Sequence, residues 1–365
     1  MIIDAHAHSF PDVSEPCGFD NVESHMRSIQ IHFTGYPQRA RRAADNAQVA
    51  EDTLYDGKNE GISGLFDVNW RVGKYGRFEW TRGGVDYRMT WMPPLMREKT
   101  EFPLDVLIAY MDLADVDKAV LHNAYVYGML NDYLGECVRQ YPDRLRAVAQ
   151  ITESRADQES EILELRRAVK ELGLVGLYFQ TEALFLNDYE FHLASERLNP
   201  LWEEVRALRI PVLWNLRPDS QPRRESYVNQ FRRVGIWARR YPDIQSVVTH
   251  GFNVRYIIDS GGRATVPDEM VEVLKLPNVT FELLFHIMQG GVWDYPYPEA
   301  QEVIKFLYRR LGASKLVWGS DIPSSLPRCT YQQSLNYVRQ HCTFISPSDM
   351  DLILGGNAAA LFRFQ

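Results

Sequence analysis

Eight short apolar segments, separated by longer stretches with helical spacing, restrict the folds open to this chain more than any other sequence feature. Their nearly continuous hydrophobicity is typical of strands that are buried on both faces of a sheet. Gly173 ends one of the intervening helical stretches as a stop signal. We predict strands at residues 1–3, 119–121, 145–151, 174–179, 210–214, 246–249, 279–284 and 316–318. We predict helices at residues 129–140, 155–172, 201–208, 227–240 and 299–311.

Strands that alternate with helices imply a parallel sheet, and eight such units predict an α/β fold, the (β/α)8 TIM barrel. The competing fold is a doubly wound open sheet, but no GxGxxG sequence opens a helix after the first strand. An α/β barrel of about 250 residues or more is a single domain. We therefore assign residues 1–365 to one domain.

Residues 10–102 interrupt the alternation. Gly83-Gly84 is a plausible turn between two strands at 77–81 and 85–90, so we predict a β-rich insertion after strand one. Loops that follow barrel strands carry the active sites of such folds. The insertion is therefore expected on the catalytic face as a lid or pocket wall, with a surface decoration as the alternative.

The net charge and the composition of the chain argue against nucleic acid as a partner. Lys and Arg number 40 against 48 Asp and Glu, so the formal net charge is −8. The composition is that of a globular protein, which excludes a disordered chain. Nucleic-acid binders carry a basic patch or stripe, and the acidic balance argues against that partner. The most basic stretch, residues 39–42, is interpreted as a solvated helix face.

Nothing in the sequence indicates a membrane or secretory protein. No apolar run approaches the ~18 residues that a membrane helix needs. The first six residues lack a basic region and a long apolar region, so no secretory signal is expected. The four cysteines have no CxxC spacing, which suits free thiols in a reducing compartment. We expect a soluble cytoplasmic protein without a membrane partner.

Ionisable residues stand where three of the predicted strands end. His6 and His8 close the first strand, and their i, i+2 spacing turns both imidazoles the same way, as half of a metal site requires. His250 follows the sixth strand and Asp321 the eighth. Each has a simpler explanation alone, His250 as a core histidine and Asp321 as the cap of a turn. Together they converge on one barrel mouth, which predicts an active site.

Four motifs carry a specific resemblance. They are IDAHAH at residues 3–8, THG at 249–251, WGSDIP at 318–323 and ILGGNAAALF at 353–362. These resemble the amidohydrolase-related (amidohydrolase 2) family, whose members include aminocarboxymuconate-semialdehyde and γ-resorcylate decarboxylases as well as hydrolases and hydratases. The resemblance covers strand one and nearly everything from Pro103 onward, whereas residues 10–101 match no motif.

The resemblance implies a role for each matching residue. His6 and His8 correspond to the two strand-one ligands of a single divalent metal ion, usually Zn or Mn. Asp321 corresponds to the strand-eight ligand that also handles a proton. His250 corresponds to an acid/base or electrophilic group. Family analogy also implies a homo-oligomer.

The chain departs from the family pattern at the end of strand five, where Asn215 replaces a metal-binding histidine. An amide oxygen is a harder and weaker ligand than imidazole and favours Mn or Mg over Zn. Three roles stay open. Asn215 binds the metal, holds a water or substrate oxygen, or marks a site that has lost tight metal binding.

Further polar residues stand near the barrel mouth. Arg217 follows Asn215 by two positions and could clamp a substrate carboxylate bidentately. His122 and Tyr178, at the ends of strands two and four, are further substrate-binding candidates. Core or rim positions are expected for Gln180, Glu282 and His286. The arginines of the insertion could contact an aromatic acid, although exposed cation–π pairs explain them equally well; these are Arg71, Arg77 and Arg88.

Together with the resemblance, these residues predict a mononuclear metal-dependent decarboxylase, a C–C lyase, of a small aromatic or unsaturated carboxylic acid. Asp321 or His250 would protonate carbon, and loss of CO2 would follow. The alternative is a hydrolase of a C–N, ester, lactone or C–C bond that uses a metal-activated water. The same residues serve both chemistries. A third hypothesis, a binding protein on a decayed enzyme scaffold, is supported by Asn215 alone.

Overall fold

The eight predicted strands are all present in the computed structural model, which describes residues 1–34, 39–59, 61–92, 98–219, 224–259, 263–284 and 293–365. They are β1 (Ile3–Ala7), β6 (Lys118–Leu121), β7 (Leu145–Ala147), β8 (Leu177–Gln180), β9 (Val212–Asn215), β10 (Ser246–Val248), β11 (Val279–Leu283) and β12 (Leu316–Trp318). Strand β1 extends beyond the predicted residues 1–3, because parallel pairing with β6 continues as far as Ala7. His6 therefore lies within the strand.

Parallel pairing arranges the strands as a closed ring. Hydrogen bonds give the orders β1-β6-β7 and β12-β11-β10-β9-β8. Two parallel bridges join these sheets, one between Ala7 and Ile322 and one between Ala149 and Leu177. The His8 amide donates to the Ile322 carbonyl at 2.9 Å across the first junction. The fold is a (β/α)8 barrel, as predicted.

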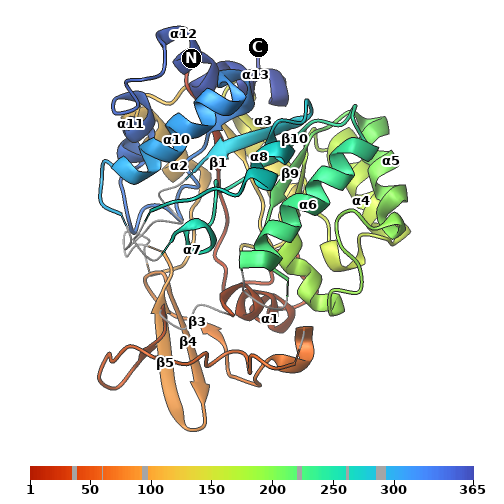
Figure 1. Ribbon diagram of the computed structural model, residues 1–365. Helices are drawn as coiled ribbons and strands as arrows, with labels where there is room; N and C mark the ends of the chain where they lie inside the picture. The colour runs from red at the N-terminus through yellow and green to blue at the C-terminus, as the bar shows by residue number, and fades with distance from the viewer. Residues whose placement is uncertain (35–38, 60, 93–97, 220–223, 260–262, 285–292) are drawn as a thin grey trace.

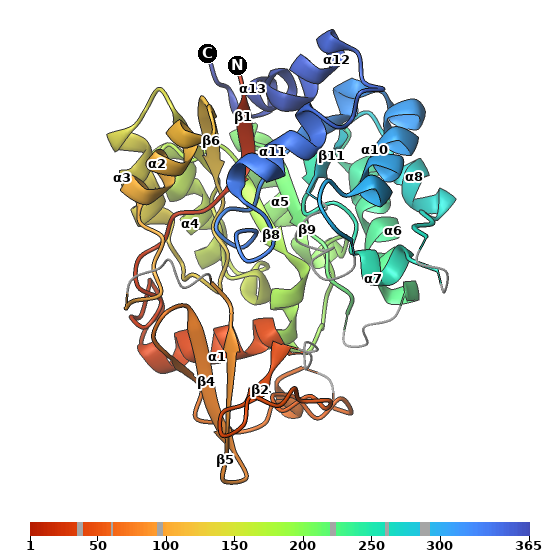
Figure 2. The same ribbon diagram turned by 90° about the vertical axis from the view of Figure 1, so that its left-hand side faces the viewer.

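Helices surround the ring on its outer side (Figure 2). The predicted ones are confirmed with small shifts at their ends. The larger helices are α2 (Leu104–Leu113), α3 (Asn131–Gln140), α4 (Glu159–Lys170), α5 (Asn199–Leu208), α6 (Arg224–Arg240), α10 (Pro298–Leu311) and α11 (Tyr331–Arg339). Shorter ones are α7 (Val254–Ile257), α8 (Asp268–Leu274), α12 (Pro347–Asp351) and α13 (Asn357–Phe362). Within the described residues, every helix is too short or too polar to cross a membrane.

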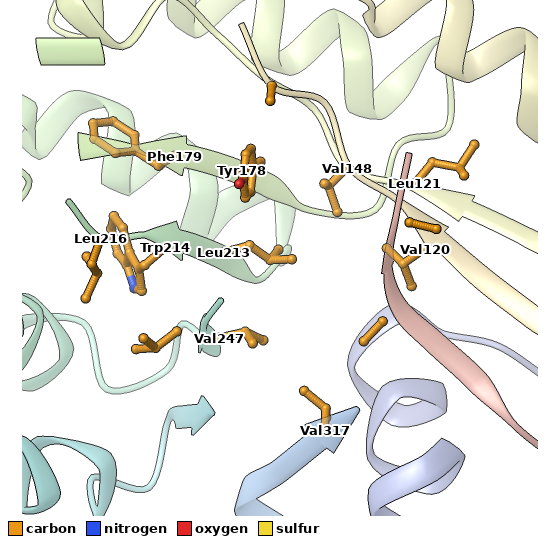
Figure 3. Packing of buried hydrophobic residues seen from close by; sticks show 14 of the residues in the cluster. Val120, Leu121, Val148, Tyr178, Phe179, Leu213, Trp214, Leu216, Val247 and Val317 are labelled. Carbon is orange, nitrogen blue, oxygen red and sulfur yellow. The ribbon is translucent and has the colours of Figure 1, made fainter. Parts of the chain in front are cut away.

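The core has an inner and an outer layer because alternate strand residues point to opposite faces. Val120, Leu213, Val247 and Val317 come from four strands and fill the interior (Figure 3). Trp214 points outward from β9, where its ring centroid lies 5.4 Å from that of Trp202 on α5 and 4.9 Å from that of Trp237 on α6. This outer layer packs the helices against the strands of the barrel.

The described part of the insertion contains an antiparallel sheet, an α-helix and a short 3-10 helix, Gly61–Gly64, and lies at the end of the barrel opposite the chain termini (Figure 1). The sheet order is β2-β5-β4-β3, with β2 (Arg41–Arg42), β3 (Arg71–Val72), β4 (Arg77–Arg82) and β5 (Val85–Thr90), and the helix is α1 (Val22–Phe33). Gly83 and Gly84 form the β4–β5 turn with φ of 57° and 77°, which suits glycine at both positions. The predicted hairpin is confirmed.

The interpretation of residues 39–42 as a solvated helix face is wrong. Arg41 and Arg42 pair with Arg88 and Tyr87 as an exposed strand. The preceding Arg39 is partly buried and lines the cavity described below. Arg41 and Arg42 form a strand because they pair with residues more than forty positions away. A short run of basic residues does not reveal such a partner, so the sequence pattern could not predict this strand.

Candidate active site

Four predicted site residues meet at one mouth of the barrel. His6 lies on β1, His8 follows β1, His250 follows β10 and Asp321 follows β12. Nε2 of His8 lies 2.8 Å from Oδ1 of Asp321, and Nε2 of His6 lies 3.9 Å from the same oxygen. Nε2 of His250 lies 3.7 Å from Oδ2 of Asp321. The barrel closure therefore brings together residues that are more than 300 positions apart.

The two strand-one imidazoles are held by their Nδ1 atoms and aim Nε2 at a common point. Nδ1 of His6 contacts the Glu282 carboxylate at 3.1 and 3.2 Å, and Nδ1 of His8 contacts the His122 carbonyl at 2.9 Å. A carbonyl only accepts, so Nδ1 of His8 carries a hydrogen, which leaves Nε2 as the ring atom that a metal ion can use. Imidazole ligands of metals are oriented in this way.

A divalent metal ion fits this group. Among the described residues, His6, His8 and Asp321 offer three ligand atoms that lie within 4.8 Å of one another, all buried. Nε2 of His6 is buried and finds no hydrogen-bond partner among the residues that the structure describes, as expected for an atom that a metal would satisfy. Two imidazoles and a carboxylate suit Zn or Mn.

Burial sets the charge state of the site. It lowers the pKa of His6 to about 3 and that of His250 to about 3. Burial alone would raise the pKa of Asp321, but the hydrogen bond from His8 and the neighbouring imidazoles outweigh it and lower that pKa. At neutral pH His6 and His250 are uncharged and Asp321 is ionised, and these are the forms that bind metal.

A buried network on Asp4 fixes the ends of β1 and β12. Oδ1 of Asp4 accepts the backbone N–H of His6 at 3.0 Å and that of Ser320 at 2.9 Å. The hydroxyl of Tyr331 donates to Oδ2 at 2.8 Å. The Asp321 amide in turn donates to the His6 carbonyl at 2.7 Å. These bonds hold Asp321, whose φ is +50°, against His6.

The other sequence-predicted residues take different positions. Asn215 is buried at the end of β9 and, with Arg217 and Tyr178, lines the cavity beside the histidines. His122 stacks behind His6 with ring centroids 3.8 Å apart, and its Nε2 lies 2.8 Å from the Ala5 carbonyl. It is outside the cavity lining. His286 lies outside the described residues.

The cavity at the barrel mouth has a volume of about 530 Å³ and an aromatic wall. Phe33 and Trp91 come from the insertion, and Tyr127 comes from the loop after β6. The Trp91 and Tyr127 rings are stacked with centroids 5.2 Å apart. The insertion thus supplies part of the pocket wall. The insertion arginines that we considered as substrate contacts are not among the lining residues; these are Arg71, Arg77 and Arg88.

Glu282 is a functional candidate that the sequence analysis placed in the core or at the rim. Its carboxylate contacts Nδ1 of His6 and also accepts the backbone N–H of His250 at 2.6 Å. Burial raises its pKa to about 7. A carboxylate within a fully buried strand whose other residues carry no charge was the available signal, because such a group requires partners.

Known proteins resemble this chain over part of their length. It is 31% identical over 138 residues to an L-fucono-1,5-lactonase of Burkholderia ambifaria, covering 35% of this chain and 45% of the relative. It is 23% identical over 253 residues to a 2-amino-3-carboxymuconate-6-semialdehyde decarboxylase of Dictyostelium discoideum, covering 63% and 64%. The matched segments span less than two thirds of either relative.

Solved structures share the fold. A dihydroxybenzoic acid decarboxylase from Polaromonas sp. JS666, crystallised with manganese and 2-nitroresorcinol, has a TM-score of 0.50 and 19% identity, covering 71% of this chain and 85% of its own. The sequence profile of the family described as Amidohydrolase matches residues 3–364, nearly the whole chain. The chain belongs to the amidohydrolase family.

Proposed function

We propose that this protein is a mononuclear metal-dependent decarboxylase of a small aromatic or unsaturated carboxylic acid. The observation that carries the proposal is the pairing of Asp321 with His250, 3.7 Å apart, at the floor of an aromatic-walled cavity that also contains Arg217. Two groups able to move a proton thus stand beside a place for a flat anion. Decarboxylation needs a proton-transfer group, because one proton replaces each CO2 released, and it needs a binding place for the carboxylic acid.

We propose that His6, His8 and Asp321 hold the metal, Mn or Zn, with Asn215 as the fourth ligand from β9. When bound, the ion supplies a Lewis acid that withdraws electron density from a substrate oxygen. An amide oxygen in place of a fourth imidazole favours Mn. The manganese in the similarly folded Polaromonas decarboxylase supports this choice.

The residues of the chain have separate tasks in this proposal. Arg217 binds a substrate carboxylate, and the guanidinium is held near Glu182, with Nε 3.9 Å from Oε2. Trp91 and Tyr127 keep the ring flat against one wall and exclude water from it. Asp321, ionised in the free protein and next to His250, takes up a proton from solvent and passes it to the substrate carbon as the bond to CO2 breaks. Tyr178 closes the inner side of the pocket.

A hydrolase is the second candidate. An ionised Asp321 is ready to take a proton from water, and the neutral His250 can donate a hydrogen bond to a lactone or amide oxygen. The similarity to a lactonase supports this chemistry. Products separate the two functions, since only decarboxylation releases CO2.

The test is turnover of a substrate panel by the manganese-loaded protein. The panel contains aromatic carboxylic acids with the carboxyl carbon labelled and the corresponding lactones, and the readouts are labelled CO2 and ring-opened acid. We expect CO2 from at least one acid. His8→Ala should lose both the metal and the activity, whereas His341→Ala, at a position outside the cavity lining, should lose neither. Formation of ring-opened acid without release of CO2 would contradict the decarboxylase proposal and support the hydrolase.

We further propose a cytoplasmic homo-oligomer with a small molecule as its partner. The four cysteines are all free and buried, which suits a reducing compartment. Size-exclusion chromatography with light scattering measures the oligomer, and a monomer at micromolar concentration would contradict this part.

A further inference from the structure

The hydroxyls of Tyr127 and Ser324 lie side by side at the wall of the cavity. Tyr127 belongs to the loop after β6 and Ser324 to the loop after β12, and both residues line the cavity. The two oxygens are 2.8 Å apart, and either can be the donor. Each hydroxyl carries one hydrogen, so this contact uses one of two. Among the residues that the structure describes, the other hydrogen has no acceptor.

A second pair of hydroxyls differs in this respect. The oxygens of Ser9 and Tyr133 lie 3.0 Å apart, and Ser9 also donates to the Phe102 carbonyl at 3.1 Å. Because the hydrogen of Ser9 is used there, Tyr133 donates to Ser9, and both hydrogens have acceptors. Neither residue is among those that line the cavity. Of these two pairs, the one at the cavity is the one that keeps an unused hydrogen.

The cavity pair is close to the candidate metal ligands. The ring centroid of Tyr127 lies 4.7 Å from that of His8. Ser324 stands three positions after Asp321, in a turn where the Ser325 amide donates to the Asp321 carbonyl at 3.1 Å. A molecule bound beside His8 and Asp321 would therefore be within reach of a hydroxyl of the pair.

We propose that Tyr127 and Ser324 form a substrate-binding pair that donates its unused hydrogen to an oxygen substituent of the substrate, separate from the carboxylate. If Tyr127 donates to Ser324, the hydrogen of Ser324 is free, and in the reverse arrangement that of Tyr127 is free. One donor thus remains in either case. The ligand class is a ring acid that also bears a hydroxyl, alkoxyl or carbonyl oxygen. The carboxylate rests on the proposed function, whereas the second oxygen is inferred from the hydroxyls alone.

Packing holds the donor in place. The ring of Tyr127 stacks on Phe10 with centroids 4.2 Å apart and on Trp91 with centroids 5.2 Å apart. A hydroxyl on a ring that is already fixed loses little freedom when it binds, which favours affinity and selectivity. Phenylalanine at position 127 would keep the stacking and remove only the hydroxyl, so Tyr127→Phe is a suitable test.

Binding calorimetry tests the inference without turnover. The manganese-loaded protein is titrated with ortho-, meta- and para-hydroxybenzoate, each beside the methylbenzoate that carries a methyl group in place of the hydroxyl. For the isomer whose oxygen reaches the pair, the affinity ratio of hydroxyl to methyl should fall about tenfold in the Tyr127→Phe, Ser324→Ala double variant. Each single variant should lower it only about twofold, because the remaining hydroxyl still has a hydrogen to donate.

Tyr133→Phe is the matched control, because it removes a hydroxyl from the pair outside the cavity lining. It should leave all the affinity ratios unchanged. Ratios in the double variant that equal those of the unaltered protein would overturn the proposal. Equal losses in each single variant and in the double variant would also overturn it, since the contact would then only join the two loops.

The same measurements separate this inference from the proposed function. If no acid releases CO2 but the affinity ratio depends on the hydroxyl pair as expected, the proposed function fails and the inference stands. If CO2 is released but the ratio is independent of both hydroxyls, the inference fails and the proposed function stands.

Discussion

The carboxylate of Glu282 contacts Nδ1 of His6 at 3.1 Å and accepts the backbone N–H of His250 at 2.6 Å. One side chain on β11 thus orients a residue of β1 and a residue that follows β10. Neither partner is its neighbour in sequence. The arrangement is that of a carboxylate behind a metal-binding histidine, which fixes the ring and makes Nε2 a better ligand.

Glu282→Gln should weaken metal binding by about 10–100-fold, because glutamine keeps one acceptor oxygen for two donors. Manganese affinity is measured by competition with a chelator, followed by elemental analysis. Glu272→Gln on the exposed side of α8 is the matched control. Equal metal content in both variants would mean that Glu282 has no part in orienting His6.

Gly319→Ala tests the packing behind the site. A Cβ at this position would lie 2.3 Å from Oε1 of Glu282 and 2.8 Å from Cβ of His6, so one of the two must move. We expect loss of bound manganese with little change in far-UV circular dichroism. Gly356→Ala should retain the metal, because a Cβ there would lie 3.2 Å from the flexible side chain of Leu352 and 3.6 Å from the Asp351 carbonyl oxygen. A fully loaded Gly319→Ala protein would contradict the placement of Glu282 against His6.

Asn215→His should raise the ratio of bound Zn to bound Mn, because imidazole is the softer ligand. The variant and the unaltered protein are dialysed against an equimolar mixture of both ions, and the metal content is measured. An unchanged ratio would place Asn215 outside the coordination sphere and leave it a substrate-binding role in the cavity.

Glu153 makes stability depend on pH. It lies in a short 3-10 turn, Glu153–Arg155, where it accepts the Gln180 amide at 3.0 Å and an amide hydrogen of Gln150 at 3.2 Å. Burial raises its pKa from 4.5 to about 8, although these hydrogen bonds oppose the shift. The folded protein holds this proton more tightly than the unfolded chain, so the free energy of unfolding falls as pH rises from about 4.5 to about 8 and then levels off.

Glu153→Gln removes that titration and keeps the acceptor oxygen. We expect the variant's melting temperature, relative to the unaltered protein, to rise between pH 5 and pH 8.5, as measured by thermal denaturation of both. Glu159→Gln on the exposed start of α4 should show no such trend. A difference that is independent of pH would mean that Glu153 is already ionised in the folded protein at pH 5.

The strand and helix order was predictable from the sequence, because it depends on local periodicity. All eight apolar segments overlap strands, and the glycine pair at 83 and 84 forms the expected turn. The less accurate predictions concern the end of strand β1 and the exposed strand β2 of the insertion. Strand β1 runs on to Ala7 because pairing with β6 supports polar residues that propensity alone would exclude. The exposed strand at Arg41–Arg42 exists through its partner β5.

The sequence by itself determined the order of the barrel strands and the residue types at their ends. Both depend on local geometry, because buried apolar runs form strands and residues i and i+2 of a strand point the same way. Only the tertiary structure decided which distant groups meet. In the tertiary structure Glu282 contacts Nδ1 of His6, and His122 stacks on His6 outside the cavity lining. Arg39 of the insertion lines the cavity. The physical reason is that a buried charge takes its partner from whichever strand lies beside it, and closure of the barrel, not distance along the chain, sets that neighbour.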